Sequence, residues 1–301
     1  MTSTVAVVGL GQMGLPLAGR TATKHDVLAF DLAPERRALA KRLDGVRVTD
    51  DLADLADVSC VVLSLPTPAA SRAVLRELAP TVRSGTLVVE TSTVLPSDVR
   101  DWSALLAPAG ARVIDAAVLS GVAQMERGAA TLLVGGDASD VADARSILDA
   151  LGGAGWTRLG DLGAGMAAKV VNNGVAHAVM VVLVEAFAMA KAQGLQLESI
   201  AEMLSRPDGG LVRPLTHRVM ERVATGNYEG GMPLEAARKD STLALAMAQR
   251  SGTPLFATQG AHTVYELAAA AGLGREDYAV VATLWEQWGA SSLAYDAESD
   301  G

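Results

Sequence analysis

The chain has 301 residues, and half of them are hydrophobic, which excludes a disordered protein and is enough to bury a sizeable core. A formal charge of −9 and an aromatic content of only 4% argue against a protein that binds nucleic acid through a basic surface or through stacked bases. Cys60 is the only cysteine, which excludes an internal disulfide and a cysteine zinc cage, so we expect a small buried hydrophobe there.

Two apolar segments raise the question of a membrane. The first 19 residues carry no charge, but they lack a basic start and are interrupted by glycines and a proline, which argues against a signal peptide. The stretch 170–184 has 15 residues, fewer than the roughly 20 that a span needs, and it contains Asn172, Asn173 and His177. We therefore expect a cytoplasmic protein that does not enter a membrane.

The first half of the chain alternates short aliphatic runs with helical patterns. Because the runs are apolar throughout, they predict a doubly wound, Rossmann-like parallel sheet with helices on both faces, that is, an α/β fold. The expected strands lie at residues 5–8, 27–30, 58–65, 86–90 and 112–118, with two more at 132–134 and 156–159. The expected helices lie near residues 15–23, 34–42, 69–79, 96–109 and 140–151.

The pattern changes after Gly163. From about residue 165 to residue 194 the sequence predicts one long helix without proline, and everything after it is also helical in pattern. We therefore divide the chain into a Rossmann domain, residues 1–163, and an all-helical part, residues 164–301.

A glycine-rich loop joins the first expected strand to the first expected helix and has the pattern G-x-G-x-x-G. The first glycine permits a tight turn, the second lets a pyrophosphate approach the backbone, and the third lets helix and strand pack closely. The helix N-terminus offers N–H groups to the phosphates. The loop residues that we expect to bind a dinucleotide are Gly9, Gly11, Gln12, Met13 and Gly14.

An acidic residue, Asp31, ends the second expected strand, 20 residues after Gly11. Its carboxylate would accept a hydrogen bond from the 2′-hydroxyl of the adenosine ribose and would repel a 2′-phosphate, which favours NAD over NADP. Arg36 and Arg37 follow closely, and an arginine there could meet a 2′-phosphate, so NADP stays an alternative. The other interpretation of both arginines is a solvated helix face.

Lys169 stands out because the chain has only five lysines and this one lies in an apolar helical segment. Desolvation lowers the pKa of a lysine, which could then exchange a proton with an oxygen that changes between carbonyl and alcohol. Asn172 and Asn173 follow at helical spacing, and Asn173 could hold the ammonium group and bind a polar group of the substrate. The alternative is a lysine that extends its charge to solvent beside surface asparagines.

Several segments together resemble the β-hydroxyacid dehydrogenase family, over residues 4–288. The loop from Gly9 to Gly14 is similar to its N-terminal signature, and residues 163–173 match its G-x-G-x-x-x-K-x-x-N-N segment. Leu65-Pro66 and the segment 91–93 resemble its cofactor-contacting loops, and Lys239-Asp240 resembles its late lysine-aspartate pair.

This resemblance implies hydride transfer between NAD and a small 3-hydroxy acid of the 3-hydroxyisobutyrate, tartronate semialdehyde or threonate type. It implies that Lys169 is the general acid/base, that Asn173 orients the substrate and that Asn172 contacts it. It also implies a long interdomain helix, a C-terminal substrate and oligomerisation domain, and a homodimer or homotetramer. The further cofactor contacts that it implies are Leu65, Pro66, Thr93 and Lys239.

The segment that resembles the family's substrate loop departs from the family pattern. The family has D-A-P-V-S-G-G, whereas this chain has D-A-A-V-L-S-G from Asp115 to Gly121. Leu119 takes the place of the carboxylate-binding serine and cannot donate a hydrogen bond. Either backbone N–H groups suffice, or Ser120 substitutes, or the substrate differs. We expect Leu119, Ser120 and Gly121 to contact the substrate.

Two other functions stay open. An imine reductase shares the architecture that the resemblance implies, but those enzymes usually carry Asp or Tyr where Lys169 stands. A non-catalytic dinucleotide-binding protein has only Leu119 in its favour. The four histidines are scattered and show no metal-binding spacing, so we expect no metal site.

Overall fold

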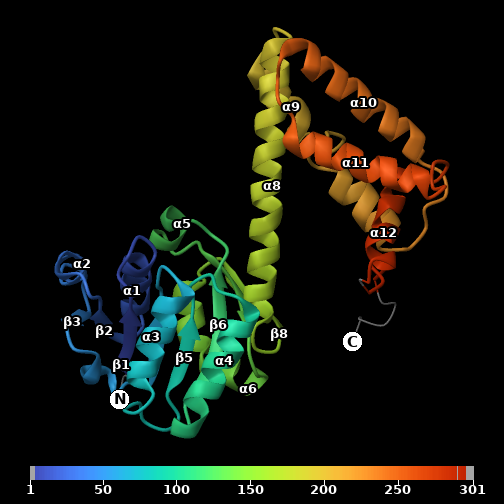
Figure 1. Ribbon diagram of the computed structural model, residues 1–301. Coiled ribbons are helices and arrows are strands. Elements are labelled where there is room, and N and C mark those ends of the chain that lie inside the picture. The colour runs from blue at the N-terminus through green and yellow to red at the C-terminus, as the bar shows by residue number, and fades with distance from the viewer. Residues whose placement is uncertain (1–3, 290, 296–301) are drawn as a thin grey trace. The chain divides into compact units, whose positions relative to one another are not determined.

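The structure, a computed structural model, describes residues 4–289 and 291–295 (Figure 1). The chain forms two compact units, Met1–Gly174 and Val175–Gly301, which divide within one long helix. The last strand ends at Gly160, and the two compact units divide after Gly174. The predicted domain boundary at residue 163 lies between these two positions.

The first unit is built on one sheet, which within the described residues has eight strands in the order β3-β2-β1-β4-β5-β6-β7-β8. Neighbouring strands are parallel except β6 and β7, which are antiparallel. The predicted fold class is confirmed, with this one reversed pair as a difference. The strands are β1 (Thr4–Val8), β2 (Asp26–Phe30), β3 (Val46–Thr49), β4 (Cys60–Leu63), β5 (Leu87–Glu90), β6 (Arg112–Val118), β7 (Thr131–Gly135) and β8 (Gly155–Gly160).

Helices cover both faces of this sheet, as Figure 1 shows. Successive residues of β1 point to opposite faces, so Val5 and Val7 enter one apolar cluster while Ala6 and Val8 enter the other. This double burial explains why the strands are apolar at every position. The helices of this unit are α1 (Gly14–Ala22), α2 (Pro34–Ala40), α3 (Pro68–Leu78), α4 (Pro96–Leu106), α5 (Val122–Glu126), α6 (Ala138–Asp143) and α7 (Arg145–Leu151), with the short turns η1 (Leu52–Leu55) and η2 (Ala107–Ala109).

Cys60 begins β4 and lies in the cluster that α1 and α7 cover. It is only 3% exposed, and burial raises the pKa of its thiol to about 12. The predicted small buried hydrophobe is confirmed.

In the part of the second unit that the structure describes, all regular elements are helices apart from an isolated bridge between Pro233 and Asp277. Its small core holds Leu234, Ala268 and Leu284. The buried Asp277 forms an ion pair with Arg218 at 3.2 Å. Its elements are the remainder of α8 (Ala164–Ala192), α9 (Leu197–Ser205), the π-helix η3 (Pro214–Val223), α10 (Leu234–Ser251), α11 (Phe256–Ala270), η4 (Tyr278–Val281) and α12 (Ala282–Gln287).

Helix α8 confirms the predicted long helix. It is longer than the apolar stretch 170–184, whose length was compared above with that of a membrane span. It has 29 residues, and an 18-residue window within it reaches a mean hydropathy of 1.8 and is mostly exposed. By length and composition it is the one helix in the described residues that is able to cross a membrane. Length is therefore no argument against a span, and the expectation of a protein outside membranes stays a prediction.

Candidate functional site

The glycine loop follows β1 and leads directly into α1, so the structure has the strand-loop-helix context that the motif requires. Gly9 has a φ of +92°, and a Cβ there would collide with the carbonyl oxygen of Ser64. A Cβ at Gly14 would collide with the carbonyl oxygen of Gly9. At Gly11, in contrast, a Cβ would meet nothing within 4 Å. Gly9 and Gly14 therefore hold the turn together, and Gly11 faces open space.

The carboxylate of Asp31 fixes the end of β2 against this loop. Its Oδ2 accepts a hydrogen bond from the N–H of Leu10 at 2.7 Å, and its Oδ1 accepts one from the N–H of Ala33 at 2.8 Å. Asp31 stays half-exposed. A carboxylate oxygen has more than one lone pair, so both oxygens can still accept a ribose hydroxyl.

A cavity of about 610 Å³ opens between the glycine loop, the end of β2 and helix α3. Its volume is typical of a cofactor pocket. The lining also includes Arg36, Ser64 and Glu77. Eight of the ten residues predicted to contact the cofactor line this cavity: Gly9, Gly11, Gln12, Met13, Gly14, Asp31, Leu65 and Pro66. Thus residues from the ends of β1, β2 and β4 meet in one place.

The open space at Gly11 and the accepting carboxylate of Asp31 are what an adenosine dinucleotide requires. The residues present therefore fit NAD(P). Of the other two predicted contacts, Thr93 is exposed and does not line this cavity. Lys239 lies on α10 in the second unit, exposed and paired with Asp240 at 3.0 Å.

The two arginines after β2 have different surroundings. Arg37 donates from Nη1 to the carbonyl oxygens of Asp31 at 2.7 Å and Leu32 at 3.0 Å, and it lies 3.8 Å from Asp50. Arg36 lines the cofactor cavity. Both are half-buried, so neither lies on a fully solvated helix face. Arg36 is therefore the arginine placed to meet a 2′-phosphate.

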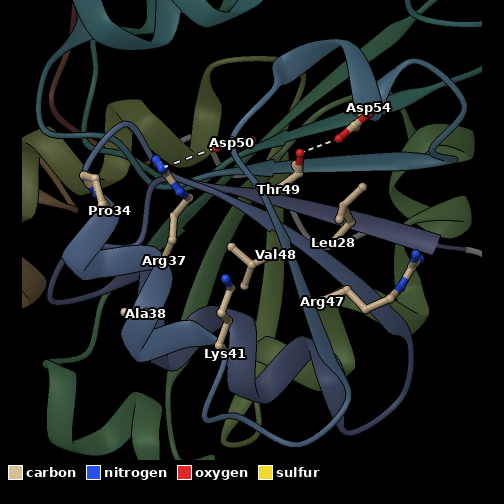
Figure 2. A pocket seen from close by; sticks show the side chains of 10 residues that line it. All are labelled: Leu28, Pro34, Arg37, Ala38, Lys41, Arg47, Val48, Thr49, Asp50 and Asp54. Carbon is tan, nitrogen blue, oxygen red and sulfur yellow. Dashed lines mark hydrogen bonds and ion pairs between the residues drawn. The ribbon is translucent and has the colours of Figure 1, made fainter.

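Arg37 lines a second hollow, of about 700 Å³, beside α2 (Figure 2). Side chains from α2, β2, β3 and the segment after β3 line it, and dashed lines mark Arg37 with Asp50 and Thr49 with Asp54. None of the predicted site residues lines this hollow. Its contacts connect α2 to the segment after β3, so Arg37 serves mainly to hold the end of β2 in place.

The loops after β4 and β5 are joined by Ser92. The N–H of Leu65 donates to Ser92 Oγ at 2.8 Å, and the N–H of Ser92 donates to Glu90 Oε1 at 2.7 Å. Glu90 is fully buried, and burial raises the pKa of its carboxyl to about 7, although hydrogen bonds from Ser92 oppose this. Sequence reasoning missed Glu90, and the available signal was an acid at the end of an apolar strand, just before the cofactor loop.

Lys169 lies in the first part of α8 and is half-buried. Desolvation lowers the pKa of its amine from the ordinary value of 10.5, in the predicted direction. Asn172 is exposed, and its Nδ2 lies 3.5 Å from Oδ1 of the half-buried Asn173. Within the described residues neither asparagine forms a hydrogen bond to Lys169, so the predicted Asn173–ammonium contact is not made here.

The segment after β6 exposes an apolar side chain where the family pattern has serine. Leu119 is 39% exposed, and its N–H donates to the carbonyl oxygen of Thr131 at 3.0 Å. Ser120 Oγ accepts from the N–H of Thr131 at 3.0 Å, which leaves its hydroxyl proton available to donate. Gly121 is exposed at the start of α5.

The described residues contain no group of three or more His, Cys, Asp or Glu able to hold a metal ion. The first unit brings together a nucleotide cavity, a desolvated lysine and a segment that offers a hydroxyl and backbone N–H groups as donors.

Comparisons with known proteins agree with this arrangement. Residues 4–158 match the NAD binding domain of 6-phosphogluconate dehydrogenase. Residues 163–285 match a family described as the NAD-binding part of NADP-dependent 3-hydroxyisobutyrate dehydrogenase. The chain is 29% identical to a probable mitochondrial 3-hydroxyisobutyrate dehydrogenase of Dictyostelium discoideum, over 93% of this chain and 90% of that one. It is 31% identical to an NAD-dependent L-serine dehydrogenase of Pseudomonas aeruginosa, over 94% and 97%.

Solved structures give the same picture. The Mycobacterium tuberculosis 3-hydroxyisobutyrate dehydrogenase with L-serine is 27% identical, with a TM-score of 0.66 over 96% of this chain and 100% of that one. An imine reductase from Myxococcus stipitatus with NAD+ reaches a TM-score of 0.84 over 95% and 100%, but at 22% identity it shows the fold alone. With its glycine loop, its lysine segment and these matches over nearly its full length, the chain belongs to the β-hydroxyacid dehydrogenase family.

Proposed function

We propose that this protein transfers a hydride between a small 3-hydroxy acid and NAD. The observation that carries the proposal is Lys169, a half-buried amine with a lowered pKa on the helix that follows the last strand of the nucleotide-binding sheet. A desolvated amine can exchange a proton near neutral pH more readily than an exposed lysine.

The cavity at the glycine loop would hold the cofactor. When bound there, NAD would supply the hydride acceptor for the oxidation, and NADH the hydride donor for the reverse direction. The backbone at Gly11 leaves room for the pyrophosphate, and the Asp31 carboxylate would accept a hydrogen bond from the ribose. A negative charge at Asp31 disfavours a 2′-phosphate, which supports NAD over NADP.

Lys169 would accept the proton of the substrate hydroxyl in one direction of the reaction and donate it in the other. In the oxidation, the neutral amine takes this proton as the alcohol becomes a carbonyl; in the reduction, the ammonium gives it back. Asn173, one helical turn further along α8, would orient the substrate, and Asn172 would contact it. One hydroxy acid and one NAD+ thus give one oxo acid, one NADH and one proton.

Leu119, Ser120 and Gly121 would meet the substrate at the end of β6. Backbone N–H groups and the hydroxyl of Ser120 would bind the carboxylate of the acid. The exposed side chain of Leu119 favours an apolar substituent on the substrate over a charged one, because an ammonium group against leucine loses water without gaining a partner. We therefore place 3-hydroxyisobutyrate ahead of L-serine as a substrate.

The test is an assay of the purified protein with NAD or NADP against a panel of acids. The panel holds 3-hydroxyisobutyrate, L-serine, threonate and tartronate semialdehyde, the last of these with NADH. We expect the NADH absorbance to grow with at least one hydroxy acid, and NAD to be preferred. If no acid is turned over while NADH still binds, the protein is a dinucleotide-binding protein without this activity.

The imine reductase alternative has no observation of its own in its favour, since those structures are similar only in fold and Lys169 is intact. A cyclic imine belongs in the same panel as a check. Reduction of the imine without turnover of any hydroxy acid would reverse the order of the two functions.

We also propose that the protein works in the cytoplasm as a homo-oligomer. In the second unit α8 exposes apolar side chains at Val175, Met180, Val181 and Val184. An exposed apolar stretch of this length is typical of a helix that a second copy of the chain covers. Light scattering on the purified protein distinguishes a dimer or tetramer from a monomer, and membrane fractionation tests the alternative that α8 enters a bilayer.

A further inference from the structure

Asp115 is a fully buried acid in β6, and its hydrogen-bond partners within the described residues include no cation. Its Oδ1 accepts from the N–H of Gly163 at 2.7 Å, and its Oδ2 accepts from the N–H of Met166 at 2.7 Å. Gly163 immediately precedes α8, which begins at Ala164, and Met166 lies in its first turn. The first N–H groups of a helix have no partner within the helix, and they form its positive end. The carboxylate of Asp115 accepts hydrogen bonds from such groups and places a negative charge at this positive end.

The surroundings leave no room for this contact to vary. A Cβ at Gly135 on β7 would lie 2.5 Å from Oδ1 of Asp115 and 2.7 Å from the backbone nitrogen of Ala164. A Cβ at Gly165 would lie 2.9 Å from Oδ2 of Asp115 and would collide with the carbonyl oxygen of Leu133. The start of α8 is thus packed directly on β6 and β7, and the carboxylate sets the position at which it docks.

This contact joins the two segments to which the proposed chemistry belongs. Lys169 lies three residues after Met166 on α8, less than one helical turn away. Leu119 lies four residues after Asp115, just beyond the end of β6. Both connections run through regular structure, so we expect a shift at Asp115 to displace Lys169 or the loop at Leu119 as well.

We propose that Asp115 is a positioning residue for the reaction: by fixing the start of α8 on β6, it sets where the amine of Lys169 stands relative to the loop at Leu119–Gly121. The proposal rests on the proposed role of Lys169. The proposal also explains why glycine stands at two positions before the lysine. Gly163 has a φ of +98° and donates its N–H to the carboxylate, and Gly165 allows the start of α8 to approach β6 and β7 closely.

A second buried acid supplies a matched control. Glu185 is 5% exposed and accepts from the N–H groups of Ala257 and Thr258 at 2.8 Å and 3.0 Å, at the start of α11. It therefore caps a helix with the same chemistry as Asp115. It also lies on α8, but more than four helical turns after Lys169 and away from the start of the helix, so it does not contact the segment that carries Lys169. A loss of stability shared by variants of both acids reports capping, whereas an effect on Lys169 is expected of Asp115 alone.

The experiment compares Asp115→Asn, Gly165→Ala and Glu185→Gln with the unchanged protein. Asparagine keeps the size of the side chain but turns an N–H2 toward one backbone N–H, and alanine at Gly165 disturbs the same contact from the helix side. Three quantities are measured: NADH affinity, kcat with the best hydroxy acid, and acetylation of Lys169 by acetic anhydride as a function of pH. The exposed Lys24 serves as the internal reference for the acetylation.

We expect Asp115→Asn and Gly165→Ala to lower kcat by about tenfold to a hundredfold, while NADH affinity changes less than about twofold. We expect the pKa of Lys169, read from acetylation, to rise toward the ordinary value of 10.5, because a displaced amine is less desolvated. Glu185→Gln should lower only the melting temperature.

The proposal is overturned if the Asp115 and Gly165 variants lose stability but keep the kcat and the Lys169 reactivity of the unchanged protein. If the unchanged protein turns over no substrate, the proposed function fails, and the acetylation alone decides the role of Asp115. If Asp115→Asn does not fold, Gly165→Ala decides.

Discussion

The N–H of Leu10 donates a hydrogen bond of 2.7 Å to the carboxylate of Asp31, across 21 residues of sequence. The acid at the end of β2 is thereby fixed to the glycine loop at the end of β1. Its charge stands at the rim of the cofactor cavity in a set orientation, so its effect on cofactor choice can be tested by a single substitution.

We expect Asp31→Asn to weaken the preference for NAD. The substitution removes the charge that repels a 2′-phosphate, and Arg36, which lines the same cavity, can then approach that phosphate. The ratio of kcat/KM with NAD to kcat/KM with NADP should fall by at least about tenfold. Adding Arg36→Ala should reverse the gain with NADP, whereas adding Arg42→Ala at an exposed position should not. An unchanged protein that already prefers NADP would contradict this account of Asp31.

The glycines of the loop should separate binding from folding. Gly11→Ala places a methyl group in open space, so we expect a melting temperature close to that of the unchanged protein but an NADH dissociation constant raised by about tenfold or more. Gly14→Ala forces a collision with the backbone at Gly9 and should mainly destabilise the fold. Thermal unfolding and fluorescence titration with NADH measure the two effects. Equal losses of stability in both variants would show that Gly11 is also needed for the turn.

Lys169→Ala should lower kcat by about a hundredfold or more, because a general acid/base contributes roughly that factor. Lys169→Arg should be as poor a catalyst of the oxidation, because arginine does not release its proton in the accessible pH range. Lys24→Ala, at an exposed position, is the control. A rate unaltered by Lys169→Ala would remove this residue from the mechanism.

The pH dependence of the oxidation follows from the lowered pKa of Lys169. The amine must be neutral to accept the hydroxyl proton, so kcat should rise with pH and level off above an apparent pKa lower than the ordinary 10.5. The reduction, which needs the ammonium form, should fall over the same pH range. Stopped or steady-state assays in both directions test this, and two profiles of the same slope would contradict it.

Glu90 should make the protein less stable as the pH rises toward neutrality. Its pKa is about 7 in the folded protein against 4.5 for an ordinary glutamate, so the folded state binds more protons between these values. The free energy of unfolding should therefore fall, by roughly 3 kcal/mol at most, as the pH rises from 4.5 to 7.

The check is urea unfolding of the unchanged protein, Glu90→Gln and the exposed control Glu126→Gln at pH 5 and pH 8. Glutamine does not titrate, so Glu90→Gln should lose less stability over this range than the other two proteins. Parallel pH dependence in all three would show that Glu90 is ionised throughout.

The sequence predicted the parts of the site that depend on local pattern. The loop from Gly9 to Gly14 and the acid Asp31 meet in one cavity because alternating strands and helices bring the carboxyl ends of parallel strands to one edge. Lys169 was found because a charge in an apolar helix is conspicuous. These features can be recognised from the residues that are close to them in the sequence.

Other features depend on contacts between distant residues. Strand β3 was not predicted because Val46–Thr49 is a short, half-buried edge strand with alternating rather than continuous apolar residues. The antiparallel direction of β7 was missed because hydrophobic period does not encode strand direction. The role of Asp115 rests on N–H groups 48 and 51 residues away, which no local pattern reveals.

Because Cys60 is buried, its reaction with a thiol reagent can report whether the nucleotide-binding unit is folded. Since the only thiol of the chain is 3% exposed and has a pKa of about 12, a maleimide or disulfide reagent at neutral pH reaches it only when the sheet opens. The rate of thiol trapping therefore measures the opening of the nucleotide-binding unit without any added label. Saturating NAD should slow this trapping, and the slowing would give a readout of cofactor binding that needs no substrate.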